Sequence, residues 1–191
     1  MSAPAKARLF VALDLPSRAR AALARWARRE LEAIDGLRLV PAAALHVTLC
    51  FLGWREEAAL GTLSELVSSC APSPSPRLGL GAPVWLPPRR PRVLAVDLDD
   101  REGTVATLQA HVSAALAAGA GYEPERRPFR PHVTVARVTR GARVGAVRAP
   151  SPPAQLAFAG EAVTLYRSRL GSGGARYEPV VRVALGPVDV G

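Results

Sequence analysis

Two short stretches of this chain are near copies of each other, and they carry two of its three histidines. The first, His-Val-Thr-Leu, begins at His46, and the second, His-Val-Thr-Val, begins at His132. Both are apolar and β-branched, which favours strands. Because side chains alternate between the faces of a strand, a His and a Thr two residues apart point to the same face. Each stretch therefore presents one imidazole and one hydroxyl on a common surface.

The repetition favours catalysis over an ordinary half-buried strand. One such stretch is typical of a strand with a solvated polar face, but here the flanking residues 51–53 and 136–138 continue both strands in the same way. Two such strands side by side would bring together two imidazoles, one able to act as an acid and the other as a base near neutral pH. We therefore interpret four residues as catalytic, namely His46, Thr48, His132 and Thr134.

Hydrophobic spacing and the positions of Gly and Pro predict a mixed chain of strands and helices. The motif histidines lie nearly half of the 191 residues apart, and similar elements recur around each, which indicates an internal duplication. A proline-rich segment at 71–76 is expected to connect the halves, and a mobile loop is expected at 140–153. Strands are expected at 9–13, 37–40, 45–52, 78–86, 92–98, 129–138, 161–170 and 176–185, and helices from Ser17 (a predicted N-cap) to Gly36, at 56–69 and at 100–118.

The sequence resembles a known family, the two-histidine phosphoesterases. Residues 8–13, 46–53, 91–94, 129–137 and 166–168 are similar to the bacterial and archaeal RNA 2′,3′-cyclic phosphodiesterases, also described as 2′-5′ RNA ligases. The resemblance runs from about residue 8 to residue 185. It implies an α+β fold of two pseudo-symmetric lobes, each an antiparallel sheet with outer helices, facing a central cleft. We expect residues 1–191 to form one such two-lobed domain.

The resemblance also implies a reaction, the opening of an RNA 2′,3′-cyclic phosphate to a 2′-phosphate, with 2′-5′ ligation as its reverse. His46 would be the proton donor to the departing 3′-oxygen, and His132 the proton acceptor that activates water. Thr48 and Thr134 would hydrogen-bond the phosphate oxygens. A 2′,3′-cyclic phosphate is a strained diester that needs no metal to open, so no metal or other cofactor is expected.

Four further residues are candidates for substrate binding. The family carries an arginine near the phosphate at the position of Arg137, but strict alternation would place it on the face opposite His132, so a twist or bulge would be required. Arg130 shares the face of His132 and is the rival candidate. Phe10 and Phe51 could stack on an RNA base, although core packing would also explain them.

One position departs from the family, because Cys50 stands where these enzymes often carry Lys. Alternation places Cys50 on the face of His46 and Thr48, so a positive charge near the phosphate would be missing. Neither Cys50 nor Cys70 has the spacing of a metal ligand or redox pair. His111 falls on a predicted helix without a Thr two residues on, and we expect it to have no catalytic function.

Composition is consistent with an RNA partner without establishing one. The formal net charge is +9, and all but one of the 25 basic residues are Arg. Arg binds phosphates through a planar fork of donors. A general bias toward Arg, Ala, Pro and Gly explains the charge equally well. The chain has no apolar run of about 20 residues and no signal-peptide pattern. We expect a cytoplasmic monomer that does not bind membranes.

Other functions stay open at this stage. The same superfamily could act on small cyclic nucleotides or 2′-5′-linked oligonucleotides instead. A non-catalytic, Arg-rich RNA-binding module would explain the charge but not the doubled motif. A zinc enzyme is disfavoured, because two isolated histidines without nearby carboxylates or a third ligand make a poor zinc site.

Overall fold

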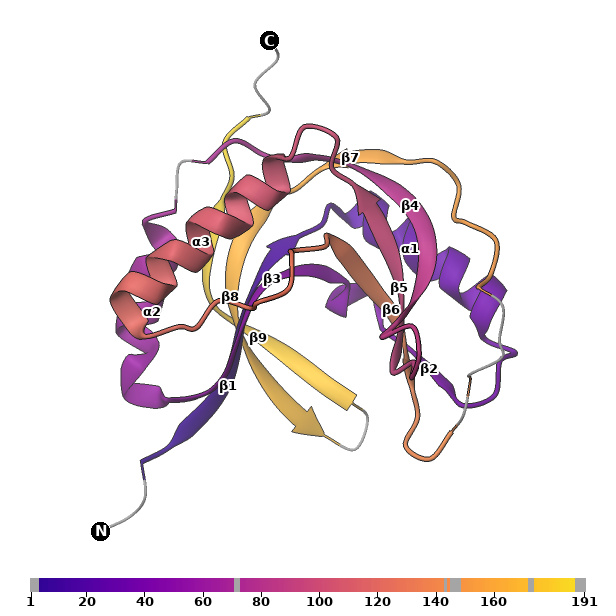
Figure 1. Cartoon of the computed structure of the whole chain (residues 1–191), viewed down its shortest axis with the longest axis horizontal. Coiled ribbons are helices and arrows are strands. Elements are labelled where there is room, and N and C mark those ends of the chain that lie inside the picture. The colour runs from indigo at the N-terminus through magenta and orange to yellow at the C-terminus, as the bar shows by residue number, and fades with distance from the viewer. Residues whose placement is uncertain (1–3, 71–72, 143, 145–148, 172–173, 188–191) are drawn as a thin grey trace.

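The strands of the protein form one curled antiparallel sheet with helices on its outer side (Figure 1). The computed structural model describes residues 4–70, 73–142, 144, 149–171 and 174–187. The sheet order is β7-β4-β5-β6-β3-β1-β8-β9, and β2 pairs with β6. The strands are β1 (Lys6–Asp14), β2 (Leu37–Leu39), β3 (His46–Glu56), β4 (Arg77–Leu86), β5 (Val93–Asp99), β6 (His132–Val138), β7 (Ala157–Ala159), β8 (Ala162–Gly171) and β9 (Gly174–Ala184).

The sheet consists of two halves that meet at the two motif strands. One half contains β3, β1, β8 and β9, and the other contains β7, β4, β5, β6 and β2. The halves join where β3 pairs with β6, at Val47 and Val133. The motif strands are therefore neighbours at the centre of the sheet. The expected α+β fold of two antiparallel lobes is confirmed, with the two sheets continuous through this junction.

The helices interleave the two halves. Helix α1 (Ser17–Leu31) follows β1 of the first half but packs against β6 and β2 of the second. Helix α3 (Thr104–Ala120) follows β5 of the second half, and with α2 (Leu60–Ser68) it covers the first half. Figure 1 shows α1 beside β4, β5 and β6, and α2 and α3 outside β8 and β9. This exchange ties the lobes together and leaves the inner face of the sheet uncovered by helices.

A single apolar core lies between the sheet and the helices. In β1, Leu9, Val11 and Leu13 are fully buried, and they share a cluster with Leu23 of α1 and Val112 of α3. Each fully buried side chain of this size stabilises the fold by about 1.5–3 kcal/mol. The core therefore fixes which face of β1, and with it which face of β3, is left for the cleft.

Two details of the predicted helices are wrong. Ser17 is the first residue of α1 and not its N-cap; Pro16 holds that place in an extended conformation, without a side-chain cap. The helix ends at Leu31 and not at Gly36, because residues 32–35 turn the chain toward β2. Gly36 has a φ of 79° in that connection. This is a left-handed conformation that favours glycine.

The remaining elements lie close to their predicted ranges, with three differences. The segment 56–69 begins with a 3₁₀ turn, Glu57–Ala59, before α2. Asp100 lies outside α3, where its carboxylate accepts hydrogen bonds from the backbone N–H groups of Val105 and Ala106. The short strand β7 was not predicted. The expected connector at 71–76 and loop at 140–153 fall partly outside the described residues, and the single-domain assignment stays a prediction.

Candidate active site

Each motif strand contains one extra residue just after its threonine. In the pairing of β1 with β3, Ala12 faces Thr48 and Val11 faces Cys50, so Leu49 has no partner. In the pairing of β5 with β6, Ala95 faces Thr134 and Leu94 faces Ala136, so Val135 has none. These are β-bulges, which reverse the alternation of side chains beyond them. The two residues at each bulge, 49–50 and 135–136, are both buried.

The bulge in β6 brings Arg137 to the face of His132. This is the irregularity that an arginine at this position requires. Arg137 lines a small pocket together with both histidines and both threonines of the motifs. The four motif residues and Arg137 therefore meet at the junction of β3 and β6. The complete lining of this pocket is Val40, Ala44, His46, Thr48, His132, Thr134, Arg137 and Tyr177.

Both motif histidines are held in the same way. The Nδ1–H of His46 donates to the carbonyl oxygen of Ala44 at 2.8 Å, and that of His132 donates to the carbonyl of Arg130 at 2.8 Å. A carbonyl can only accept, so Nδ1 carries the proton in each ring and Nε2 is left for other partners. Nε2 of His46 lies 3.2 Å from the hydroxyl oxygen of Thr48.

The ring of His46 is enclosed by aromatic side chains. Phe10 stacks on it with a centroid distance of 4.9 Å, and Tyr177 meets it edge-on at 5.3 Å. Burial lowers the pKa of His46 to about 4, and the positive charges of Arg137 and His132 also lower it. The hydrogen bond to Ala44 and the charge of Asp14 act in the opposite direction but do not offset the burial. His46 is therefore neutral at pH 7 in the unliganded protein.

A groove of about 300 Å³ continues from the pocket along the first half of the sheet. It shares His46, Thr48, Arg137 and Tyr177 with the pocket and has no carboxylate in its lining. Three guanidinium groups enter it, and none of them forms an ion pair with a carboxylate of the described residues. The groove is therefore suited to an anionic ligand. Its remaining lining residues are Arg8, Phe10, Arg38, Phe51, Ser168, Gly171 and Ala175.

Arg130, the rival to Arg137, has another partner. Its guanidinium forms a two-point ion pair with Asp97, through Nε at 2.9 Å and through Nη2. Asp97 is the β5 residue opposite His132. Arg130 lines neither the pocket nor the groove, and its link to the site is the carbonyl that holds His132. Its side chain is thus directed away from the position of a ligand between the histidines.

The expected position of Cys50 is wrong. The bulge at Leu49 turns Cys50 away from His46, and its side chain is buried beside Tyr122 and Gln109. This burial raises the pKa of the Cys50 thiol to about 11. The cleft position that follows the bulge belongs to Phe51, whose side chain is 44% exposed. The Cys in place of Lys therefore removes no charge from the cleft in this structure.

Several residues around the site were not singled out from the sequence. Arg38 comes next to Arg137 through the pairing of β2 with β6, and Tyr177 comes from β9. Asp14, opposite His46 in the sheet, is buried. Its carboxylate accepts hydrogen bonds at 2.9, 2.9 and 3.0 Å from the side chains of Thr164, Tyr166 and Arg182. The position of Asp14, an acidic residue at the end of an otherwise apolar strand, was a sequence signal that could have identified it.

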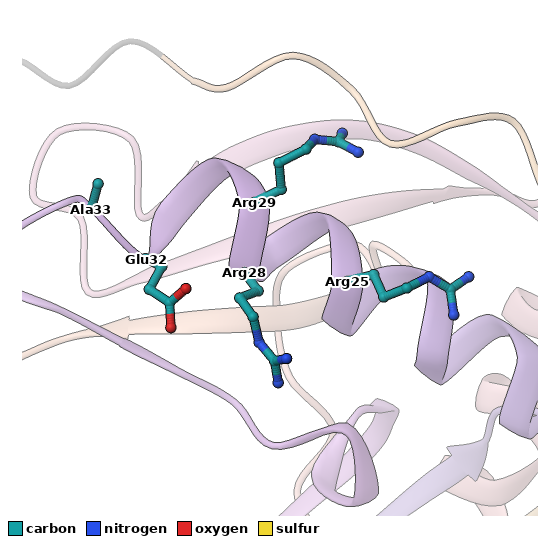
Figure 2. A pocket seen from close by; sticks show the side chains of 5 residues that line it. All are labelled: Arg25, Arg28, Arg29, Glu32 and Ala33. Atoms are coloured by element: carbon teal, nitrogen blue, oxygen red, sulfur yellow. The ribbon is translucent and has the colours of Figure 1, made fainter.

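A second hollow, of about 500 Å³, lies on the outer side of α1 and contains none of the motif residues. Figure 2 shows Arg28 and Glu32 extending to one side of the helix and Arg29 to the other. The hollow is formed by long, exposed side chains of a single helix and its end, Arg25, Arg28, Arg29, Glu32 and Ala33. The candidate active site is therefore the pocket at the junction of β3 and β6. His111, on the exposed side of α3, is in neither hollow nor groove.

Comparison with known proteins identifies the family. The model of the 2′-5′ RNA ligase superfamily matches residues 15–171, so the chain belongs to this superfamily. Among its relatives is the RNA 2′,3′-cyclic phosphodiesterase of Escherichia coli K12, an enzyme 34% identical over 93% of this chain and 96% of the relative. The resemblance noted from the motifs is confirmed.

Solved structures agree with this assignment. TT0787 of Thermus thermophilus superposes with a TM-score of 0.78 at 30% identity, covering 93% of this chain and 97% of that one. E. coli LigT complexed with 3′-AMP gives a TM-score of 0.75 at 29% identity, covering 95% and 99%. Within the described part of the chain, no cluster of three or more His, Cys, Asp or Glu is placed to hold a metal ion. Nor is any helix there long and apolar enough to cross a membrane.

Proposed function

We propose that this protein hydrolyses RNA 2′,3′-cyclic phosphate ends to 2′-phosphates, with its two motif histidines as acid and base and without a metal. One observation carries the proposal. Two imidazoles, each with Nδ1–H on a backbone carbonyl, line one pocket together with two threonine hydroxyls and a guanidinium. The names of the curated relatives, RNA 2′,3′-cyclic phosphodiesterases, support the choice of substrate.

The proposed reaction needs one proton taken and one proton given. Nε2 of His132 takes a proton from water, and the water oxygen attacks phosphorus. The bond from phosphorus to the ribose O3′ breaks, and His46 donates its Nε2 proton to O3′. The product is a 2′-phosphomonoester with a free 3′-hydroxyl. The division of roles follows the family resemblance, since the hydrogen bonds that hold the two rings are equivalent.

His46 must gain a proton before it can act as the acid. In the unliganded protein its pKa of about 4 keeps it neutral. A cyclic phosphate bound in the pocket places a negative charge near the ring, and an opposite charge favours the protonated form. Substrate binding would therefore charge His46, so that the acid is prepared only when the phosphate is present.

Thr48, Thr134 and Arg137 would stabilise the charge that develops on the non-bridging oxygens. Preorganised donors of this kind act most strongly where water is excluded. Arg137 is the strongest candidate for the charged donor, because it lines the pocket without an ion-pair partner among the described carboxylates. A 5′-hydroxyl of RNA in the place of water would give a 2′-5′ linkage by the same steps, which is the proposed route to ligation.

The test is an oligoribonucleotide ending in a 2′,3′-cyclic phosphate, incubated with the protein in excess chelator. We expect conversion to a 2′-phosphate terminus, slowed by at least about 10²-fold with His46→Ala or His132→Ala. Loss of activity in chelator with recovery in zinc would contradict the mechanism, and a 3′-phosphate product would contradict the leaving oxygen. RNA binding without turnover would indicate the non-catalytic alternative, and turnover of cyclic mononucleotides alone would indicate the small-substrate alternative.

A further inference from the structure

Large hydrophobic side chains that remain exposed gather on the strand that carries His46. Among the described residues, three such side chains are exposed, namely Phe51 at 44%, Trp54 at 62% and Val180 at 37%. Phe51 and Trp54 both belong to β3. Aromatic side chains bury large areas when they find a partner, so two exposed rings on one strand indicate a binding surface.

A second bulge in β3 places Trp54 on the cleft face. Phe10 of β1 faces Phe51, and Leu9 faces Gly53, so Leu52 has no partner. Gly53 has a φ of 69°. This is the left-handed conformation found in bulges of this type. Without the extra residue, Trp54 would point to the helix side. With it, Trp54 faces Arg8, a residue that lines the groove.

Arg8 contacts one of the two aromatic side chains and is the strand neighbour of the other. Its Cζ is 4.9 Å from the centroid of the Phe51 ring, and its backbone pairs with that of Trp54. No ion pair joins Arg8 to a carboxylate of the described residues. The cleft face of β3 thus presents, from the pocket outward, His46, Thr48, Phe51 and Trp54, and the guanidinium of Arg8 lies beside Phe51.

We propose that Phe51, Arg8 and Trp54 form a track for single-stranded RNA leading away from the reacting end. Phe51 stacks on the base of the terminal nucleotide, Trp54 stacks on the base before it, and Arg8 contacts the phosphate between them. The proposal deepens the proposed function, on which the position of the cyclic end rests. Aromatic side chains alternating with basic ones are the usual means of holding single-stranded nucleic acid.

The spacing along β3 provides two stacking positions. Phe51 and Trp54 face Phe10 and Arg8, which are two residues apart on β1, so the two rings lie about 7 Å apart along the strand. Each ring takes one base, and the base of the terminal nucleotide lies on Phe51, the ring nearer the pocket. A mononucleotide would therefore reach Phe51 and leave Trp54 unused. The track makes the enzyme selective for RNA strands over cyclic mononucleotides.

Charge favours RNA over a protein partner for this surface. The groove contains Arg8, Arg38 and Arg137 and no carboxylate, and it is continuous with the pocket for the reacting phosphate. A negatively charged RNA chain that begins in the pocket would neutralise these arginines one after another along the groove. The track ends where Glu56 of β3 faces Lys6 of β1.

The kinetic test compares a cyclic mononucleotide with a dinucleotide and a tetranucleotide that end in the same cyclic phosphate. We expect Trp54→Ala to raise the KM of the two longer substrates about tenfold more than that of the mononucleotide, since each stacked base contributes substantially to affinity. Trp54→Phe should restore most of the loss. Phe51→Ala should raise KM for all three. Val180→Ala and Arg25→Gln, at an exposed apolar and an exposed basic position elsewhere, serve as matched controls.

A binding measurement separates this proposal from the proposed function. RNA ending in a 3′-phosphate should quench the fluorescence of the wild-type protein, and Trp54→Phe should abolish most of that change. Quenching without any hydrolysis by the wild type would overturn the proposed function and keep the track. Hydrolysis with equal KM changes for short and long substrates would overturn the track. So would a change in sedimentation mass on Trp54→Ala with RNA affinity unaltered, which would mark a protein interface.

Discussion

The two motif strands share one backbone design and differ in the chemistry placed on it. Strands β3 and β6 each carry a His, a Thr and a bulge directly after the Thr. The bulge brings the third residue after the Thr to the cleft face. At that equivalent position β3 has Phe51 and β6 has Arg137. Under the proposed function this difference would suit an asymmetric substrate, with the arginine on one side for the phosphate and the aromatic ring on the other for a base.

The surroundings of the two histidines also differ, with aromatic neighbours around His46 and charged neighbours around His132. His46 lies against Phe10 and Tyr177, and burial keeps it neutral. His132 lies beside the ion pair of Arg130 with Asp97. Two groups of the same type in different environments are the usual basis for dividing the roles of acid and base.

The largest expected effect tests whether both strands are needed. His46→Ala and His132→Ala should each lower kcat/KM for a cyclic-phosphate oligonucleotide by about 10²- to 10⁴-fold, since each removes one proton-transfer group. The double variant should lose little more than either single one, because the two groups act in one step.

The control for this comparison is His111→Ala, which should leave kcat/KM unchanged, with thermal unfolding measured for every variant. A loss confined to one motif histidine would show that the second strand is a structural copy without a catalytic part.

The next effect tests the equivalence of the two hydroxyls. Thr48→Val and Thr134→Val keep the shape of the side chain and remove one donor, which should lower kcat by about 10²-fold if each donor stabilises the transition state. Equal losses would support a symmetric phosphate between the strands. An effect on KM alone would instead mean that the hydroxyls bind the ground state, contrary to the proposal.

A smaller effect should distinguish Arg137 from Arg130. Arg137→Gln should lower kcat/KM by about ten- to a hundredfold, the range for a lost hydrogen bond to a charged group. Arg130→Gln breaks an exposed ion pair with Asp97. It should change kcat/KM by less than about threefold, since exposed pairs contribute little. The reverse order of these losses would place the phosphate on the other side of His132.

Alternation around His46 and His132 predicted the motif faces, because it is local, whereas the two antiparallel halves were implied by the family resemblance. Alternation also showed that Arg137 needed a bulge. It did not show where the bulges lie, since Leu49 and Val135 are apolar like their neighbours, and for that reason Cys50 was placed on the wrong face. Both residues at each bulge are buried only because of how the folded sheet packs, so the sequence alone does not reveal the bulge. A shift of one residue then moves every side chain beyond it to the other face of the sheet.

Partners from distant segments were also beyond sequence reasoning. Arg38 and Tyr177 enter the groove through the pairing of β2 with β6 and of β9 with β8. Trp54 shares the cleft face through the bulge at Leu52. No local pattern marks these residues, because their positions depend on register between strands far apart in the chain.

The smallest expected effect concerns stability and pH, and it tests the different burial of the two histidines directly. The pKa of His46 is about 4 in the folded protein and 6.5 is its ordinary value, so between these values the unfolded state binds more protons. Stability from this group is therefore complete above about pH 6.5 and is lost as pH falls toward 4. Between about pH 8 and about pH 5.5 the free energy of unfolding of the wild type should fall by roughly 1 kcal/mol more than that of His46→Gln, as measured by urea unfolding.

Inorganic phosphate provides the second half of this test. If the anion binds beside His46, it raises the pKa of the ring, so the wild type should lose less of its free energy of unfolding at about pH 5.5. His46→Gln has no imidazole at this position and should not show this pH-dependent gain in stability. The same shift should appear in kinetics. The general acid must be protonated, so His46 controls the alkaline limb, and that limb should lie at higher pH for kcat, which reports the bound enzyme, than for kcat/KM. Coincident limbs would mean that the bound phosphate does not charge His46, and the aromatic side would then supply the base rather than the acid.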